Sequence, residues 1–168
     1  MKALIQRVRG RTAITVEEPR NFTHSPTEFF DGVGLVVLLA WVEKDLDAPN
    51  LEVIEDWILS RILGLRIFED AQGRMNLNLA DYAKENKLAS GILWVSQFTL
   101  AAELDSGFRP SFKRAMNPLS AKIYYDRFCS KVKENSPHQN LFGVFGANMD
   151  LSFTNWGPVS IMLDKETP

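Results

Sequence analysis

The chain has 168 residues, 45% of them hydrophobic, and a formal net charge of −2. This length allows one well-filled core and is short for two independent domains, so we expect residues 1–168 to form a single domain. The nearly balanced charge gives no general electrostatic case for a protein that coats nucleic acid, so any RNA contact is expected to be local.

The only cysteine, Cys129, has no partner for an intramolecular disulfide, and the first residues lack the apolar run that a signal peptide needs. The expected setting is therefore reducing and cytoplasmic. The longest apolar run, residues 32–42, is far shorter than the ~20 residues of a membrane helix. We expect a buried strand there and no membrane association.

Two short runs rich in β-branched residues, 3–8 and 12–17, lie on either side of Gly10 and predict a hairpin. Arginines occupy every second position around that glycine and would share one face of a continuing strand: Arg7, Arg9 and Arg11. A solvated strand edge accounts for Arg9 and Arg11. For Arg7 the sequence is compatible with either a strand-edge position or a functional role.

Residues 18–31 are polar, contain two prolines and predict a surface loop. After the apolar run, Asn50 is a candidate helix cap. The residues that follow recur at helical spacing and predict a helix packed on a sheet: Leu51, Ile54, Trp57, Ile58, Ile62 and Leu65. A turn within residues 68–79 predicts another hairpin.

Residues 91–100 predict a strand whose apolar half gives way to Ser96, Gln97 and Thr99, and sites tend to form at such a polar end. Asn117 and Pro118 can begin a helix that continues to about Glu134. One side of this helix carries Ala121, Tyr124, Phe128 and Val132. Three short β-like pieces follow, at 140–146, 148–155 and 158–163. The expected fold is mixed α/β, a largely β core in layers with two main helices packed on it.

Metal and cofactor chemistry have little support in the residues. The two histidines, His24 and His138, lie in polar segments without the spacing of a zinc site, and no Gly-x-Ser-x-Gly elbow accompanies them. Cys129 is interpreted as a small buried hydrophobe. A phosphate loop and a dinucleotide fingerprint are both absent. The residues alone therefore indicate a site of backbone groups and hydroxyls, drawn from residues 96–99, 107–112 and 157–158.

Several of these segments resemble the D-aminoacyl-tRNA deacylase family, also called D-tyrosyl-tRNA deacylase, and the resemblance covers nearly the whole chain. The diagnostic pieces are Ser-Gln-Phe-Thr at 96–99 and Asn-x-Gly-Pro at 155–158, where the family pattern ends in Thr at the position of Ser160. Further matching segments are "ALIQRV", "VEKD", "RIFEDAQGRMNLNL", "GFRPSF" and "FGANM". The resemblance implies hydrolysis of the ester between a D-amino acid and the terminal adenosine of tRNA, without a metal or another cofactor, and possible action on glycyl-tRNA.

The resemblance also implies a site at the interface of a homodimer. Gly157 and Pro158, joined by a cis peptide bond, would reach into the pocket of the other subunit and present carbonyl oxygens to the α-amino group of the substrate. Arg7 would orient this dipeptide. Phe145 and Met149 would line the pocket.

The reacting ester would lie against Ser96, Gln97, Phe98 and Thr99, with backbone N–H groups near Phe98 and Thr99 stabilising the oxyanion. Thr99 is a natural nucleophile candidate, but the sequence offers no convincing base to activate it. The ribose 2′-OH of the tRNA is an equally good participant. We favour a site that positions substrate and water, with Thr99 assisting.

Four features depart from the family pattern: Ser160 for threonine, the bulky Trp156 at a variable position, Asn148 for aspartate, and a long 18–31 segment. They bear on substrate preference and tRNA docking more than on the reaction. The alternative function is a catalytically inactive member of the same fold that binds tRNA or another nucleic acid through Arg109, Lys113 and Arg114. A solvated loop explains those three charges equally well.

Overall fold

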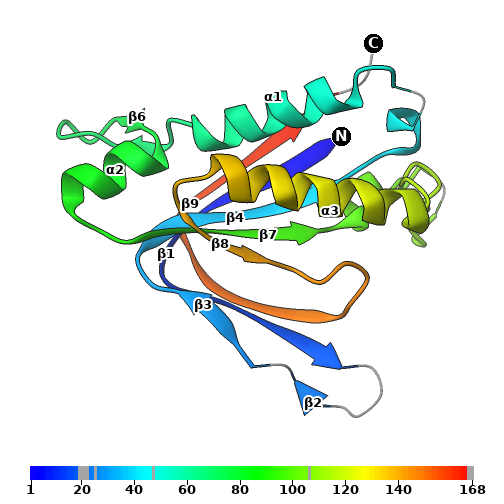
Figure 1. Ribbon diagram of the computed structural model, residues 1–168, viewed down its shortest axis with the longest axis horizontal. Helices are drawn as coiled ribbons and strands as arrows, with labels where there is room; N and C mark the ends of the chain where they lie inside the picture. The colour runs from blue at the N-terminus through cyan, green and yellow to red at the C-terminus, as the bar shows by residue number, and fades with distance from the viewer. Residues whose placement is uncertain (19–22, 25, 47, 106, 166–168) are drawn as a thin grey trace.

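The computed structural model describes residues 1–18, 23–24, 26–46, 48–105 and 107–165 (Figure 1). Its strands are β1 (Lys2–Glu18), β2 (Thr23–His24), β3 (Glu28–Phe30), β4 (Val33–Ala40), β5 (Phe68–Glu69), β6 (Met75–Leu77), β7 (Ser90–Ser96), β8 (Gln139–Phe142) and β9 (Met149–Asp164). Its α-helices are α1 (Leu51–Leu63), α2 (Leu79–Asn86) and α3 (Pro118–Asn135), and its 3-10 helices are η1 (Glu43–Asp45) and η2 (Phe98–Ala101). The predicted mixed α/β fold with a largely β core is confirmed.

One large sheet organises the molecule. The strands β2, β1, β4, β7 and β8 lie in that order, and β3 and β9 also pair with β1. β4, β7 and β8 run parallel, whereas β1 is antiparallel to both β4 and β9. In Figure 1, α1 and α3 cover one face of this sheet, and β3 and the curved β9 fold back under the other face. The carboxyl ends of β4 and β7 therefore meet at one edge, where open α/β sheets commonly form their sites.

The core occupies both faces of β4, which is buried along almost its whole length. A large cluster packs between the sheet and the two long helices and includes Ile58 and Phe128. A smaller cluster on the opposite face is built around Phe30. The Phe30 ring lies directly against Gly34 and Gly91, where an added Cβ would come within 2.7 and 2.3 Å of ring atoms.

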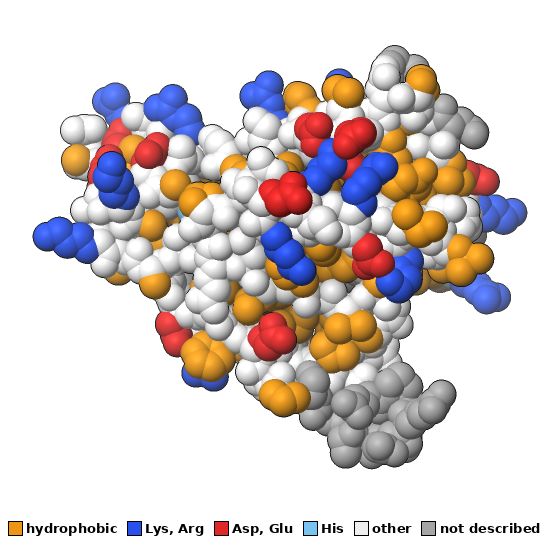
Figure 2. All heavy atoms as spheres, viewed as in Figure 1, with side chains coloured by type: hydrophobic (Ala, Val, Ile, Leu, Met, Phe, Trp, Pro, Cys, Tyr) orange, Lys and Arg blue, Asp and Glu red, His pale blue; other side chains and the backbone are white. Residues whose placement is uncertain are grey.

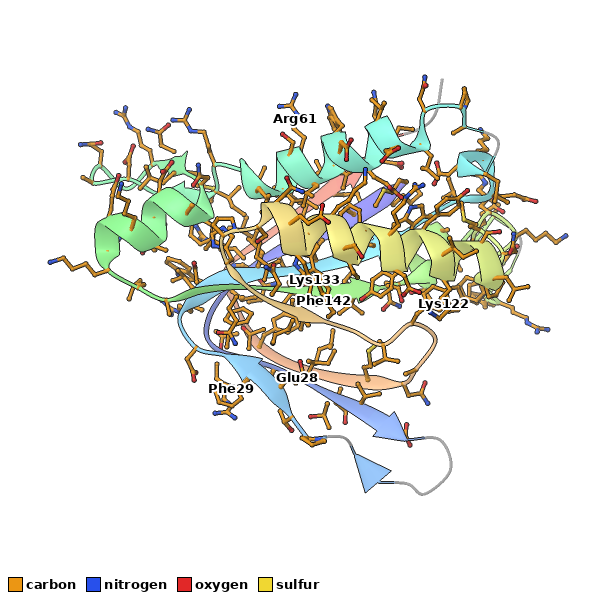
Figure 3. All side chains as sticks on the ribbon, viewed as in Figure 1. Glu28, Phe29, Arg61, Lys122, Lys133 and Phe142 are labelled. Atoms are coloured by element: carbon orange, nitrogen blue, oxygen red, sulfur yellow. The ribbon has the colours of Figure 1, made fainter. Side chains whose placement is uncertain are left out.

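The predicted hairpin around Gly10 is wrong, because β1 is one continuous strand. Gly10 has φ +73° and lies where the pairing of β1 with β9 shifts register, so it forms an irregularity instead of a turn. The edge interpretation is wrong for Arg9, which pairs with Val33 on one side and with Thr154 on the other. Arg11 is exposed and lies within the register shift between Arg9 and Ala13. The Arg9 guanidinium lies over the Trp156 ring. The Arg11 guanidinium lies 3.6 Å from the ring centroid of Phe29, whose place on β3 is labelled in Figure 3.

The loop predicted for residues 18–31 is only partly tested, because residues 19–22 and 25 lie outside the described part of the chain. The described residues 23–24 and 28–30 are short strands that pair with β1 instead of a loop. The three β-like pieces near the C-terminus also differ from the prediction, since the last two are joined in the single long strand β9.

Both predicted long helices are confirmed. Asn117 caps α3 by accepting a hydrogen bond from the Ser120 N–H, whereas Asn50 precedes α1 without such a bond. The buried stripe of α3 contains Tyr125 in place of the predicted Tyr124. The hairpin β5–β6 is confirmed as well. The short helix α2 was not predicted; it begins after Asn78, whose side chain accepts from the Asp81 N–H.

Candidate active site

A cavity of about 620 Å³ opens at the carboxyl ends of β4 and β7. Its walls come from those strand ends, from η2, from the first turns of α3, from residues 145–148 and from the start of β9. Most of the lining side chains are apolar, and the polar ones are few: Ser96, Gln97, Asn117 and Asn148. A large apolar cavity with a few polar groups is the usual form of a small-ligand site.

The predicted polar strand end forms one wall of this cavity, although the strand is shorter than predicted. β7 ends at Ser96, and the Gln97 N–H donates to the Leu39 carbonyl oxygen over 2.6 Å. Its neighbour β8 ends opposite Trp94, so among the described strands none pairs with β7 on that side beyond this point, and the chain turns into η2. Ser96, Gln97 and Phe98 line the cavity, and the exposed Thr99 lies beside it.

Two backbone donors are free at this turn. The Leu100 N–H donates to the Gln97 oxygen and the Ala102 N–H to the Thr99 oxygen. Among the described residues, none accepts a hydrogen bond from the N–H of Phe98 or Thr99. The first N–H groups of a helix have no partner within it, so these two can bind an external anion or carbonyl oxygen.

The Thr99 hydroxyl has no neighbouring base in the described part of the chain. Its hydrogen-bond partner is the side-chain amide of Gln97, whose Nε2 lies 2.5 Å from Thr99 Oγ1. An amide does not take up a proton at neutral pH, so the arrangement orients the hydroxyl without activating it.

Aromatic side chains form the mouth and the far wall. Phe98 is 57% exposed, and its ring lies 5.0 Å from that of Phe112 in an edge-to-face arrangement. Phe145 and Met149 also line the cavity. The buried Tyr125 hydroxyl lies within hydrogen-bond distance of the carbonyl oxygens of Trp94 and Gly143 and so holds the segment that carries Phe145. Burial raises the pKa of Tyr125, which keeps its hydroxyl neutral.

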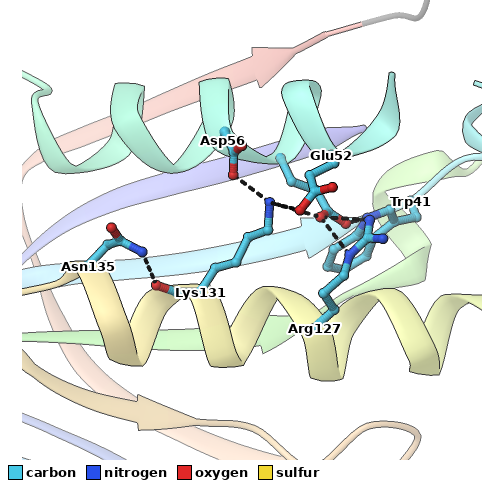
Figure 4. Close-up of polar contacts among 7 residues, drawn as sticks. Trp41, Glu52, Asp56, Arg127, Lys131 and Asn135 are labelled. Atoms are coloured by element: carbon cyan, nitrogen blue, oxygen red, sulfur yellow. Dashed lines mark hydrogen bonds and ion pairs between the residues drawn. The ribbon is translucent and has the colours of Figure 1, made fainter. Parts of the chain in front are cut away.

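Sequence reasoning did not identify Trp41 and Tyr125 at this site. The spacing of Ala121, Tyr125, Phe128 and Val132 follows one helix face and could have identified Tyr125. Trp41 lines the cavity, and its Nε1 donates to the buried carboxylate of Glu55 over 3.2 Å. Arg127 and Lys131 of α3 approach the same carboxylate and join α3 to α1 (Figure 4). Only the tertiary fold brings these residues together.

Gly157 and Pro158 lie in a wide irregularity of β9. Gln6 pairs with Ser160 and Val8 with Asn155, so the four residues 156–159 face Arg7 alone. Both residues of the dipeptide are exposed, and their peptide bond is cis, as the resemblance implies. Gly157 has φ +123°, and a Cβ there would lie 2.8 Å from Val159 Cγ2 and 2.9 Å from Arg7 Nη2.

Arg7 supports this dipeptide from below and is only 2% exposed. Its Nε donates to the Trp156 carbonyl oxygen over 3.0 Å, and its Nη1 donates to that of Ile67 over 2.6 Å. Burial lowers the pKa of Arg7 and the carboxylate of Glu69 opposes that shift, but an arginine remains a cation. Arg7 is therefore an internal support of the Gly-Pro segment and not a strand-edge charge.

Within one chain, the dipeptide and the cavity are far apart. Ser96 is level with Leu39, Ala3 and Leu163 across the sheet, and Leu163 is five residues beyond Pro158. Three strand spacings and five residues of strand length separate Ser96 from Pro158 by about 20 Å. The structure thus brings together residues 96–98 with Phe145 and Met149, but it does not bring Arg7, Gly157 and Pro158 to the same cavity.

The three predicted tRNA-binding side chains are exposed beyond the cavity mouth, in the segment that carries Phe112. Arg114 pairs with Glu103 over 2.6 Å. Arg109 and Lys113 have no acidic partner among the residues described. Figure 2 shows acidic and basic side chains interspersed over α1 and α3, so the described part of that face presents no broad surface of one sign.

Other candidate groups lie away from the cavity. His138 lies in the short connection between α3 and β8, as predicted, but it is buried there, with its Nδ1 2.8 Å from Ser90 Oγ. Nothing can be added for His24, whose side chain is outside the described structure. Cys129 is partly buried, and burial raises its pKa to about 11. The described residues contain no cluster of metal-ligating side chains and no helix long and apolar enough to span a membrane.

Comparisons with known proteins agree with the resemblance noted from the motifs. The sequence pattern of the family described as D-Tyr-tRNA(Tyr) deacylase matches residues 4–164. The chain is 36% identical to the D-aminoacyl-tRNA deacylase of Myxococcus xanthus over 168 residues, covering 100% of this chain and 97% of that protein. It is 40% identical to the Escherichia coli O1:K1 / APEC protein of the same name over 163 residues, covering 97% and 99%.

Solved structures give the same fold. The structure named c-Myc DNA Unwinding Element Binding Protein aligns with a TM-score of 0.76 at 31% identity, covering 99% of both chains. A probable eukaryotic D-amino acid tRNA deacylase aligns with a TM-score of 0.69 at 17% identity, covering 98% of this chain and 100% of the other, and supports the fold alone. With its motifs and its sequence matched from end to end, the chain belongs to the D-Tyr-tRNA(Tyr) deacylase family.

Proposed function

We propose that this protein hydrolyses the ester bond of D-aminoacyl-tRNA and releases the free D-amino acid and tRNA. The observation that carries the proposal is the pair of free N–H groups, on Phe98 and Thr99, within the family motif at the cavity mouth. The residues that line the cavity come from positions spread between Leu39 and Leu151. We therefore also propose that residues 1–168 work as one domain.

The reaction needs stabilisation of an oxyanion more than it needs a strong base. Water adds to the ester carbonyl carbon, and the negative charge on the carbonyl oxygen is held by the N–H groups of Phe98 and Thr99. The C–O bond to the terminal ribose then breaks, and the proton released by water passes to the leaving ribose oxygen. One such donor is worth roughly 10²–10³ in rate. We propose that Thr99 and the ribose 2′-OH orient the water and relay this proton.

The separation of Gly157 and Pro158 from the cavity supports a homodimer. We propose that the exposed dipeptide of each subunit enters the cavity of the other and accepts hydrogen bonds from the substrate α-ammonium through its carbonyl oxygens. A D-amino acid directs its side chain away from the dipeptide, whereas an L-amino acid would collide with it. Glycine has no side chain to collide, so glycyl-tRNA is a second expected substrate.

We propose that Arg109, Lys113 and Arg114 contact the tRNA backbone in a cytoplasmic setting. Because Arg114 is already paired with Glu103, the two other cations are expected to contribute more. Two or three phosphate contacts give a shallow salt dependence compared with the 6–10 contacts of extensive nucleic-acid binders.

The test is hydrolysis of matched D- and L-tyrosyl-tRNA by the wild-type protein and by two variants. We expect release of D-tyrosine only, slower turnover in Thr99→Ala, and weakened or relaxed selectivity in Gly157→Ala, where the new Cβ meets Val159 and Arg7. Failure to release either amino acid, combined with tRNA binding that neither substitution changes, would favour the inactive nucleic-acid-binding alternative. The solved relative named for DNA binding makes that alternative specific enough to test.

Co-expression tests the shared site. A chain with Thr99→Ala and a chain with Gly157→Ala are each impaired alone, but a mixed dimer contains one cavity with both residues intact. We expect D-selective turnover to recover in the mixture. A mixture that behaves as the average of its two parents would place the dipeptide and the cavity in the same subunit and reject the proposed interface.

A further inference from the structure

We propose that Trp156 is a positioning residue for stereoselectivity, because its side chain holds the guanidinium of Arg7 and thereby fixes the orientation of Gly157 and Pro158. This inference rests on the proposed function, in which the dipeptide selects the enantiomer. Trp156 comes directly before Gly157, at the variable position of the Asn-x-Gly-Pro motif.

Trp156 contacts Arg7 in two independent ways. Its carbonyl oxygen accepts the Nε hydrogen bond, and its ring centroid lies 4.4 Å from the guanidinium carbon. The remaining Arg7 contacts are the hydrogen bond to Ile67 and the Phe68 ring at 6.0 Å. A cation with a flat face and a forked edge is immobilised when both are occupied. Removing the Trp156 ring would leave the edge bonded and the guanidinium with only the more distant ring of Phe68.

The indole is itself held by elements that are distant in the sequence. Its centroid lies 6.2 Å from that of Phe68 on β5 and 5.9 Å from that of Tyr82 on α2. The guanidinium of Arg9 adds a second cation, 5.4 Å from the indole centroid. The hairpin and α2 therefore fix Trp156 against β1, and Trp156 connects them to the exposed dipeptide.

The consequence for Gly157 follows from distance. Arg7 Nη2 lies 2.9 Å from the point where a Gly157 Cβ would be, so the guanidinium directly supports the Gly157 backbone. If Arg7 gained freedom, the carbonyl groups of the dipeptide would gain it too. A filter that distinguishes enantiomers by collision tolerates little movement, so selectivity is expected to fall more than the rate with the correct substrate.

A packing role alone makes a different prediction, and Trp57 provides the matched control. Trp57 is also partly buried against the main core, and its ring also carries two cations, Arg61 at 5.3 Å and Lys165 at 5.5 Å. It lies on α1 and has no contact with Arg7 or the dipeptide among the described residues. Loss of either indole should lower the stability of the protein, but only loss of Trp156 should change the stereoselectivity set by Gly157 and Pro158.

The experiment compares Trp156→Leu, Trp156→Phe and Trp57→Leu with the wild type. We expect the ratio of kcat/KM for D- over L-tyrosyl-tRNA to fall about tenfold in Trp156→Leu, the scale of a desolvated cation–π contact. Trp156→Phe keeps an aromatic face and should retain most of the ratio, and Trp57→Leu should retain all of it. An unchanged ratio in Trp156→Leu, or an equal loss in Trp57→Leu, overturns the inference.

Hydrogen exchange separates this inference from the proposed function. The peptide covering residues 155–161 should exchange about tenfold faster in Trp156→Leu than in either the wild type or Trp57→Leu, whether or not the protein is active. Unchanged exchange overturns the positioning role. A wild-type protein that hydrolyses neither substrate overturns the proposed function and the selectivity claim with it, while faster exchange in the variant would still support the structural role of Trp156.

Discussion

Arg7 and Glu55 are both almost inaccessible to solvent, at 2% and 0% exposure, but different kinds of group surround their two charges. Glu55 faces two cations, with Arg127 Nη2 at 2.8 Å and Lys131 Nζ at 3.9 Å, and it also accepts from Trp41. Arg7 is met by two carbonyl oxygens and aromatic faces. Within the described residues no carboxylate bonds to it.

The contrast separates a structural charge from a charge that supports a site. A buried ion pair with its partners in place joins elements firmly, and removing one partner leaves a buried charge unpaired. The Glu55 group joins α1 to α3 and stands behind the cavity wall. The Arg7 group instead holds an exposed dipeptide, and carbonyl partners fix its position without neutralising it. Substitutions in the two groups should therefore affect different measurements.

Arg7→Lys should have the largest effect. Lysine keeps the charge but has no planar fork, so it cannot bond both carbonyl oxygens and stack on Trp156 at once. We expect kcat/KM for D-tyrosyl-tRNA to fall about 30-fold, the scale of one lost charge-assisted hydrogen bond, together with a lower D-over-L ratio. Arg127→Lys is the matched control and should keep that ratio. An Arg7→Lys enzyme with wild-type selectivity would show that Arg7 does not position the filter.

Arg127→Met should lower stability and leave selectivity unchanged. The substitution leaves Glu55 with the distant Lys131 and the Trp41 N–H, and we expect a loss of about 2 kcal/mol in the free energy of unfolding. This lies below the range for fully buried pairs because Arg127 is 38% exposed. Urea unfolding measures it.

A double variant sharpens the assignment. Adding Glu55→Gln to Arg127→Met removes the unpaired carboxylate, so the double variant should be more stable than Arg127→Met alone. If the losses of stability from Arg127→Met and Glu55→Gln were additive, the charges of Arg127 and Glu55 would not interact. Glu55 could then not serve as the example of a paired structural charge to compare with Arg7.

Local patterns were sufficient for the parts of the fold that depend on neighbouring residues. The helical spacing from Leu51 and the Asn117 cap predicted α1 and α3, and the apolar run predicted β4. Gly10 shows the limit, since either a turn or an irregular strand satisfies the same glycine. Pairing with the distant β9 and β3 decided for the strand. The Glu55–Arg127 pair is equally non-local, because it joins residues 72 positions apart.

The candidate site likewise has a part that local motifs indicated and a part that depends on contacts between distant elements. The motif resemblance named residues 96–98, Phe145 and Met149, and all of these residues line one cavity. Trp156 was noticed only as a bulky departure, because the partners that explain it, Arg7, Phe68 and Tyr82, come from three other elements. A spacing rule cannot report contacts of this kind.

A third buried ionisable side chain, His138, extends the comparison with the smallest expected effect. It has neither an ion-pair partner in the described structure nor a place near the cavity, since it lies at the opposite, amino end of β7 and β8. Burial lowers the pKa of His138 below its ordinary value of 6.5. The unfolded chain therefore binds a proton more readily than the folded protein does. The stability contributed by neutral His138 is present above pH 6.5 and is lost as the pH falls through 6.5 toward the folded-state pKa.

His138→Gln tests this sign. Glutamine can still bond to Ser90 but does not titrate, so the wild type should lose stability relative to the variant as the pH falls from 8 to 5, while both keep the same D-over-L ratio. Urea unfolding across that range gives the difference directly. Parallel stability curves would mean that the histidine titrates alike in both states. A changed D-over-L ratio would mean that the amino end of β7 and β8 influences the Gly157–Pro158 dipeptide. That result would contradict the division between structural charges and charges that support the site.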